Sequence, residues 1–245
     1  MTIPDASQFR IAAIICAAGS GTRFGNENGS KLDADLHGEA VLIRATEAIA
    51  SRPEVGTTIV AGPADPGALS TFREKHATRL ESLSATICAG GESERYETVQ
   101  AALAFVLKQG PRPDAVLVHD AARPCTSAEI VQSVIDILRS DQAVVPAIPV
   151  ADTLKRAASG TEPQLVTGTI DRRDLFACQT PQGFLTDLLE RAYAQQDLTS
   201  TDDAQLIERL GESVVLVAGD PRNLKITRPH DLDIARAIWP TLRTP

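Results

Sequence analysis

The sequence predicts an α/β fold of the Rossmann-like kind, in which a mostly parallel sheet is flanked by helices. Between Ile11 and Val150, short apolar runs alternate with segments of helical periodicity, which indicates crossover connections between parallel strands. The 245 residues are 43% hydrophobic, which is enough to bury a sizeable core. Several apolar runs end at small or polar residues, and open α/β sheets bind ligands beyond the carboxyl ends of their strands. We therefore expect a ligand site at that edge of the sheet.

The elements expected up to residue 150 alternate regularly. The strands are predicted at Ile11–Ala17, Thr57–Ala61, Ala85–Ala89, Val116–His119 and Ala143–Val150. The helices between them are predicted from Asp65-Pro66 to about His76 and at Val41–Ala50, Glu97–Leu107 and Ser127–Arg139. Asp65 suits a helix cap and Pro66 a first helical turn. After about residue 178, an extended segment, two helices, a strand and a final helix are expected at Gln179–Phe184, Leu185–Gln195, Thr201–Leu210, Val214–Val217 and from Pro229.

The arm is a segment from about 150 to 178 that departs from this alternation. Asp152–Arg156 and Leu165–Asp171 predict two strands with a polar turn at Ser159-Gly160. Such an excursion has little core of its own and is usually a lid or an arm that packs on another subunit. No repeat, low-complexity stretch or linker divides the sequence, so we expect a single domain over residues 1–245.

Charge and cysteine usage argue against several classes of protein. The net charge of −8 argues against a nucleic-acid binder, which needs a positive field. No run of 18 apolar residues and no signal-peptide pattern occurs, so we expect a cytoplasmic protein without membrane contact. The cysteines form no C-x-x-C pair, which predicts reduced, buried thiols at Cys16, Cys88, Cys125 and Cys178.

The first predicted strand runs into a glycine-rich turn that indicates a nucleotide site. Gly19 and Gly21 allow a sharp turn with close approach of the backbone to a phosphate, and Arg23 and Lys31 supply positive charge. The dinucleotide fingerprint G-x-G-x-x-G fails because its third glycine would fall at Phe24, and no Walker loop occurs. A tight turn with two solvated cations stays open as the structural alternative.

Further polar clusters follow the later strands. In order they are His119-Asp-Ala-Ala-Arg-Pro124, Asp152-Thr-Leu-Lys-Arg156, Thr169-Ile-Asp-Arg172, Gln179-Thr-Pro-Gln182, Thr201-Asp-Asp-Ala204 and Asn223-Leu-Lys-Ile-Thr-Arg-Pro229. With the glycine-rich turn, they closely resemble the 2-C-methyl-D-erythritol 4-phosphate cytidylyltransferases of the non-mevalonate isoprenoid pathway. The resemblance covers about residues 11 to 238. It implies a nucleotidyltransferase (nucleotide-diphospho-sugar transferase) type of fold with a protruding β-arm.

The resemblance also implies an activity and a set of site residues. CMP would pass from CTP to 2-C-methyl-D-erythritol 4-phosphate, giving 4-diphosphocytidyl-2-C-methyl-D-erythritol and pyrophosphate, with Arg23 and Lys31 as catalytic cations. The implied CTP contacts are Ala17, Ala18, Gly19, Gly21, Gly91, Arg95, Thr98, Asp120 and Ala121. The implied acceptor contacts are Arg123, Thr153, Arg172, Thr180 and Lys225. A homodimer is implied in which Arg172 reaches the partner's site, and Mg²⁺ or another divalent cation would be held mainly by the CTP phosphates, without a direct protein ligand.

The sequence departs from the family pattern at two places. The family usually has Pro-Lys-Gln-Tyr around its catalytic lysine, whereas this chain has Ser30-Lys31-Leu32-Asp33 after a longer loop. The segment Gly90–Arg95 is one residue longer than the usual spacing. Ribitol 5-phosphate stays open as the acceptor, and a nicotinamide-dependent oxidoreductase and a non-catalytic nucleotide sensor are more remote alternatives.

We expect structural roles for three polar residues near the predicted site. Asp202 and Asp203 predict a helix N-terminus, where the helix dipole favours negative charge. His119 is expected to be structural, because transfer to a phosphate monoester that is already largely dianionic gives a general base no task.

Overall fold

A mixed β-sheet forms the centre of the computed structural model, which describes residues 9–19, 24, 30–160 and 163–242. The strand order is β10-β5-β9-β4-β1-β2-β3, with β8 paired to β5 beside this path. The strands are β1 (Ile11–Cys16), β2 (Val55–Gly62), β3 (Ala85–Ala89), β4 (Ala115–Asp120), β5 (Ala143–Pro149), β8 (Phe176–Cys178), β9 (Gln182–Leu185) and β10 (Val215–Ala218).

Most of the sheet is parallel, as the alternation of strands and helices predicts. β1 pairs in parallel with both β2 and β4, β2 with β3, and β5 with β10. The extended segment expected from Gln179 turns out to be a central strand, because β9 lies antiparallel between β4 and β5. Helix α4 (Ala128–Ile137) and its C-cap Leu138 approach this strand so closely at Gly183 that an added Cβ would lie 2.6 Å from the Leu138 and Val134 side chains. The predicted α/β class is confirmed.

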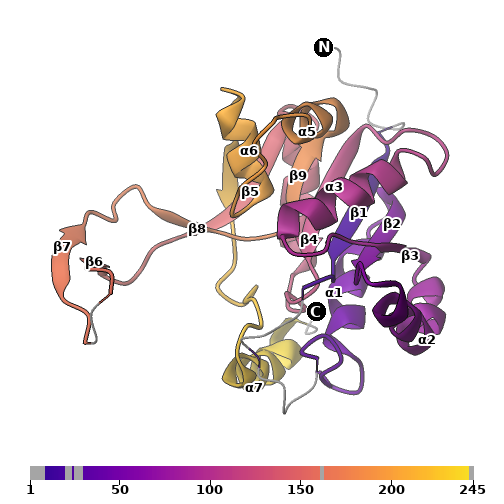
Figure 1. Ribbon diagram of the computed structural model, residues 1–245, viewed down its shortest axis with the longest axis horizontal. Helices are drawn as coiled ribbons and strands as arrows, with labels where there is room; N and C mark the ends of the chain where they lie inside the picture. Colours follow the sequence, from indigo (N-terminus) through magenta and orange to yellow (C-terminus); the bar gives the residue numbers. More distant parts are fainter. Residues whose placement is uncertain (1–8, 20–23, 25–29, 161–162, 243–245) are drawn as a thin grey trace.

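Helices cover both faces of the sheet (Figure 1). On one face lie α1 (Val41–Ala50), α2 (Pro66–Ser82), α4 (Ala128–Ile137) and α7 (Pro229–Ile238), followed by the 3-10 turn Trp239–Leu242. On the other lie α3 (Arg95–Val106), α5 (Thr186–Tyr193) and α6 (Asp203–Arg209). Alternate residues of β1 serve the two layers, with Ile11 and Ile15 on the first side and Ile14 on the second. A strand buried on both faces explains the continuous apolar run in the sequence.

The helix starts follow local capping chemistry. Asp65 accepts a hydrogen bond from the Ala68 amide at 2.8 Å, which confirms the predicted cap of α2. This helix continues past the expected end near His76 to Ser82, because Leu80 adds a fully buried side chain. Helix α3 begins at Arg95, two residues earlier than expected, because its N-cap residue Glu94 and Glu97 form a capping box.

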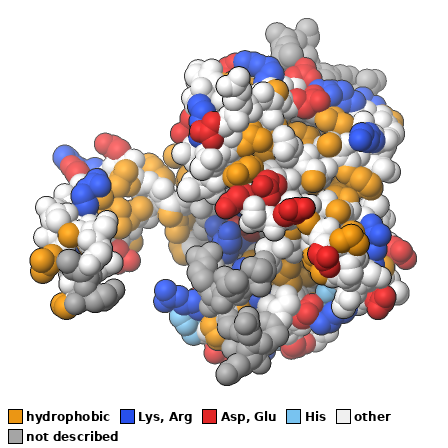
Figure 2. Space-filling model, in the orientation of Figure 1, with side chains coloured by type: hydrophobic (Ala, Val, Ile, Leu, Met, Phe, Trp, Pro, Cys, Tyr) orange, Lys and Arg blue, Asp and Glu red, His pale blue; other side chains and the backbone are white. Residues whose placement is uncertain are grey.

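The predicted arm extends away from the body of the molecule (Figure 1). Its strands β6 (Leu154–Ala157) and β7 (Val166–Ile170) pair with each other in an antiparallel hairpin, and β8 returns the chain to β5. Figure 2 shows hydrophobic side chains at the surface of the arm. Leu165 is 65% exposed, Val166 62% and Phe176 45%. The residues of the arm that the structure describes form no core that would bury them.

Two sequence expectations concern compartment and thiols. Across the part of the chain that the structure describes, no helix is both long and apolar enough to cross a bilayer. All four cysteines are free; Cys88 and Cys125 are buried as predicted, whereas Cys16 is only partly buried. The prediction is wrong for Cys178, which is exposed because β8 lies at the base of the arm.

Candidate functional site

A cavity of ≈ 340 Å³ opens where β1 and β4 end, in the size range of small-molecule sites. The chain runs from β1 to β2 on one side of β1, and β4 pairs with β1 on the other side. The cavity therefore occupies the crevice in which open α/β sheets bind their ligands. Most of the predicted site residues that the structure describes line it: Ala17, Ala18, Gly19, Lys31, Gly91, Arg95, Thr98, Asp120, Ala121 and Lys225. Sequence reasoning did not single out Leu32 or Thr227, which also line it.

Gly91 forms the side of the cavity next to helix α3. Its amide donates to Thr98 Oγ1 at 3.2 Å, so the backbone lies directly on the first turn of the helix. An added Cβ would lie 2.3 Å from the Glu97 Cβ and 2.6 Å from the Thr98 amide nitrogen. Only glycine allows this approach, which leaves the edge of the backbone facing the cavity.

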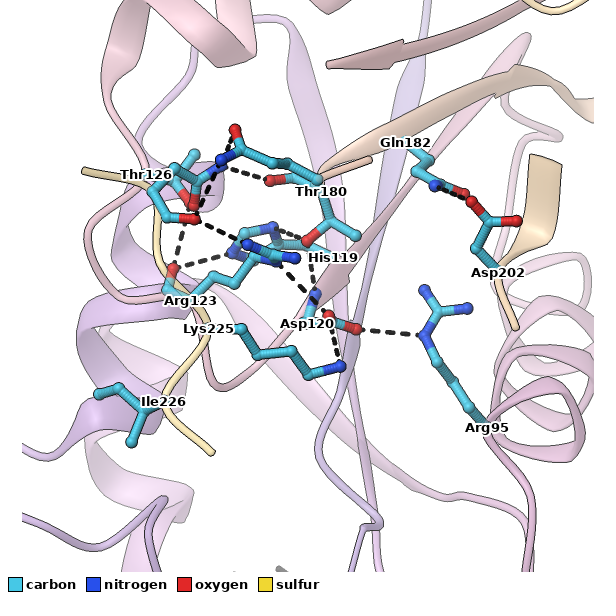
Figure 3. Close-up of polar contacts among 12 residues, drawn as sticks. Arg95, His119, Asp120, Arg123, Thr126, Thr180, Gln182, Asp202, Lys225 and Ile226 are labelled. Atoms are coloured by element: carbon cyan, nitrogen blue, oxygen red, sulfur yellow. Dashed lines mark hydrogen bonds and ion pairs between the residues drawn. The ribbon is translucent and has the colours of Figure 1, made fainter. Parts of the chain in front are cut away.

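Asp120, the last residue of β4, lies at the centre of a group of three cations (Figure 3). Arg95 Nε is 3.1 Å from one carboxylate oxygen, and Lys225 Nζ and Arg123 Nε are 2.9 Å and 3.6 Å from the other. Burial alone would raise the pKa of Asp120, but these cations outweigh it and hold that pKa well below its ordinary value. The cluster therefore keeps a carboxylate and three positive charges together at neutral pH.

Arg95 joins Asp120 to a second carboxylate. Its Nη1 lies 2.6 Å from Asp203 Oδ2, and the Tyr193 hydroxyl donates to Asp203 Oδ1 at 2.5 Å. Asp202 caps α6 as expected by accepting from the Gln205 amide at 3.0 Å. Asp203 opens α6, which confirms the predicted helix start, but its side chain is fully buried and points inward to Arg95, a pairing that the sequence did not predict. The sequence signal for this pairing was the arginine that opens α3, because a buried guanidinium needs a carboxylate partner.

Lys31 reaches the cavity from the segment that precedes α1. Its Nζ donates to the Ile226 carbonyl at 3.2 Å, which connects this segment to the loop that carries Lys225. Two residues further on, Asp33 pairs with Lys75 at 2.6 Å and with His76 at 2.9 Å, both from α2. The segment is therefore attached on two sides, and the lysine is held at the mouth despite the unusual sequence around it.

Some predicted site residues lie elsewhere. Thr180 and Arg123 lie behind Asp120 and are not among the described residues lining the cavity, and Thr153 and Arg172 are exposed on the arm. Asn223 connects the first pair, because its carbonyl accepts from Arg123 Nη1 at 2.7 Å and its amide donates to the Thr180 carbonyl at 2.9 Å. Gly21 and Arg23 fall outside the described residues, so their roles stay predictions.

The described lining residues offer no activated nucleophile. Cys16 borders the cavity, but burial raises the pKa of its thiol to about 12, so the thiolate is not populated at neutral pH. Burial lowers the pKa of His119 to about 4, which keeps the imidazole neutral, and it does not line the cavity. The arrangement is suited to binding and orienting anions, with reacting groups supplied by the ligands.

Comparison with family models identifies the family to which this chain belongs. The model of 2-C-methyl-D-erythritol 4-phosphate cytidylyltransferase matches residues 11–241. The chain belongs to this family. As a member of the cytidylyltransferase family it is a nucleotidyltransferase, and the expected family resemblance is confirmed.

Individual relatives of the same name agree. The 2-C-methyl-D-erythritol 4-phosphate cytidylyltransferase of Rhodococcus jostii is 42% identical over 230 residues, covering 93% of this chain and 94% of that protein. A crystal structure of 4-diphosphocytidyl-2C-methyl-D-erythritol synthase matches with a TM-score of 0.78 at 33% identity, covering 95% of this chain and 99% of that one. The Thermus thermophilus cytidylyltransferase structure matches with a TM-score of 0.73 at 30% identity, covering 96% and 100%.

Proposed function

We propose that this cytidylyltransferase transfers CMP from CTP to 2-C-methyl-D-erythritol 4-phosphate, releasing pyrophosphate in isoprenoid precursor biosynthesis. The observation that carries the proposal is the cluster of Arg95, Arg123 and Lys225 around Asp120, beside a cavity bordered by Lys31, in a chain of this family. These are charges suited to two phosphorylated ligands that must lie side by side. Gly91 and the ends of β1 and β4 supply the backbone surface that receives the nucleotide.

The reaction follows from the charges on the ligands. A phosphate monoester has a second pKa of about 6, so the acceptor is largely dianionic near neutral pH and needs no general base. An acceptor oxygen attacks the α-phosphorus of CTP, the bond from that phosphorus to the bridging oxygen breaks, and pyrophosphate leaves with the electron pair. Lys31, with Arg23 as a further predicted cation, stabilises the charge that develops on the phosphoryl oxygens.

A divalent cation is expected to arrive with the nucleotide. Among the described residues no three His, Cys, Asp or Glu side chains lie together as a metal site, and the carboxylate of Asp120 is already paired with cations. These residues fit Mg²⁺ bound through the triphosphate, because this ion is usually held by few carboxylates and by substrate oxygens. The ion would neutralise charge on the leaving pyrophosphate.

Pyrophosphate release tests the proposal directly. Purified protein with CTP, Mg²⁺ and methylerythritol phosphate should release pyrophosphate, whereas ribitol 5-phosphate or CTP alone should give much less. Lys31→Met should reduce turnover by about 10²–10³-fold while the fold is kept, because a preorganised charge is lost at the reacting phosphate. Lys108→Met is the matched control, because Lys108 is exposed just beyond the C-terminal end of α3. No release above background from the wild-type protein would refute the proposal.

We also propose that the chain acts as one domain that forms a homodimer through the arm. The exposed Leu165, Val166 and Phe176 support this, because a second copy would bury them. Thr153 and Arg172 would then contribute to the partner's site. Mixing inactive Lys31→Met and Arg172→Ala proteins should restore activity, since each mixed dimer contains one complete site. A monomer in sedimentation equilibrium, or no recovery on mixing, would contradict the proposal.

A further inference from the structure

The imidazole of His119 is fully buried and has no part in the reaction described above. It lies one residue before Asp120 in β4, between Thr180 and the backbone of Arg123 (Figure 3). Its Nδ1 is 3.0 Å from Thr180 Oγ1, and its Nε2 is 3.2 Å from the Arg123 carbonyl oxygen. Both ring nitrogens therefore contact residues that flank the cation cluster.

The partners determine which ring nitrogen carries the proton. A carbonyl oxygen can only accept, so Nε2 donates to Arg123 and the neutral ring leaves Nδ1 as an acceptor. The Thr180 hydroxyl must then donate to Nδ1, and its oxygen accepts from the Asp120 amide at 3.1 Å. Hydrogen bonds thus run in one direction from Asp120 through Thr180 and His119 to Arg123.

The charges around the ring favour this neutral form. Burial lowers the pKa of His119 to about 4; Asp120 opposes that shift, while Arg123 and Arg95 add to it. The imidazole therefore stays neutral across the pH range in which the acceptor phosphate is dianionic.

Both ends of this chain of hydrogen bonds are members of the charged cluster. At one end is the backbone of Asp120, and at the other that of Arg123, whose side chain contacts Asp120 and the Asn223 carbonyl. We propose, on the basis of the function proposed above, that His119 is a positioning residue that sets the spacing of Asp120 and Arg123 through its two ring nitrogens. A core histidine that only filled space would tolerate any polar replacement of similar size.

The two nitrogens are not equally replaceable. Thr126 Oγ1 lies 3.1 Å from the Arg123 carbonyl oxygen and 2.8 Å from Asn223 Oδ1, so its one proton can turn to the Arg123 carbonyl if Nε2 is lost. In the described structure the Thr180 hydroxyl has Nδ1 as its acceptor. Asparagine at position 119 keeps an acceptor near the place of Nδ1, and glutamine keeps a donor near that of Nε2. Loss of the Nδ1 acceptor should therefore be the more harmful change.

The kinetic test compares His119→Asn with His119→Gln in pyrophosphate release. We expect kcat to fall about tenfold in His119→Gln and less than about threefold in His119→Asn, with little change in KM for CTP. Thr180→Val should lose as much as His119→Gln, Thr180→Ser should recover most of it, and combining Thr180→Val with His119→Gln should add little. Thr186→Val is the matched control, because its buried hydroxyl donates to the Pro113 carbonyl away from the cavity.

Nitrogen NMR of the imidazole provides a readout independent of turnover. At neutral pH, His119 should show a protonated Nε2 and a bare Nδ1, and Thr180→Val should shift the Nδ1 signal. A protonated Nδ1, equal losses in the two His119 variants, or additive effects with Thr180→Val would overturn the inference. If the wild-type protein releases no pyrophosphate while the NMR result holds, the proposed function fails and the hydrogen-bond geometry stands. Should a His119 variant not fold, the Thr180 pair and the NMR spectrum decide.

Discussion

Replacing Asp120 with asparagine removes a charge that three cations share while keeping the size of the side chain. At separations of 2.9 Å to Lys225, 3.1 Å to Arg95 and 3.6 Å to Arg123, each pair contributes about 5 kcal/mol before desolvation at an effective dielectric of about 20. Arg95 keeps Asp203, and the Lys225 side chain is 36% exposed, so water can replace part of its loss. The Arg123 side chain is only 12% exposed, so water compensates least for the loss of its carboxylate partner.

We therefore expect Asp120→Asn to lower the free energy of unfolding by about 3–5 kcal/mol, the usual cost of breaking a buried ion pair. Urea denaturation followed by circular dichroism measures this. Because the folded-state pKa of Asp120 is lowered, its contribution is complete above its unfolded value of about 4 and is lost only as the pH falls through the folded value. The difference between wild type and variant should thus stay constant from about pH 5 to 8.

A matched surface variant separates this effect from the general loss of a carboxylate. The Asp233 side chain is 76% exposed in its pair with Arg236, so Asp233→Asn should change stability by less than about 0.5 kcal/mol. Pyrophosphate release should fall by about 10²-fold or more in Asp120→Asn and stay unchanged in Asp233→Asn. An unfolding free energy within about 1 kcal/mol of wild type for Asp120→Asn would refute the account of the cation cluster.

Three further outcomes are expected. Gly91→Ala should weaken CTP binding about tenfold in calorimetry because its Cβ would lie 2.3 Å from Glu97, whereas Gly56→Ala, with open space around it, should bind normally. Phe184→Ala should cost about 3–5 kcal/mol in urea denaturation, because this side chain is fully buried at the centre of the sheet; a cost below about 1 kcal/mol would contradict that packing. The folded-state pKa of His119, about 4, lies below the unfolded-state pKa of about 6.5. The contribution of the neutral imidazole to the free energy of unfolding is therefore complete above about pH 6.5 and falls by about 3 kcal/mol as the pH drops to about 4. Urea denaturation across this pH range should show a shallower loss for His119→Asn.

Much of the fold follows from local patterns in the sequence. Helix α1 and strand β3 occupy the predicted residues, because apolar spacing and breakers act within one segment. Asp65 caps α2 as predicted, and Ser127, the predicted first residue of the next-but-one helix, caps α4, since a cap bonds an amide within its own helix. The position of β9 could not be found in this way, because Gln182–Leu185 has the same extended pattern in any place in the sheet.

The candidate site likewise has one part that the sequence predicts and one part that it does not. The order of residues places glycines, cations and Asp120 after the strand ends, and parallel pairing of β1 with β4 then brings them to one edge. Packing of distant segments, in contrast, makes Asp203 the buried partner of Arg95, 108 residues away. Packing also places Thr180 behind Asp120, 60 residues away. The reason is physical: a buried charge or hydroxyl is satisfied by whichever group packing brings within about 3 Å, and spacing along the chain carries no record of that choice.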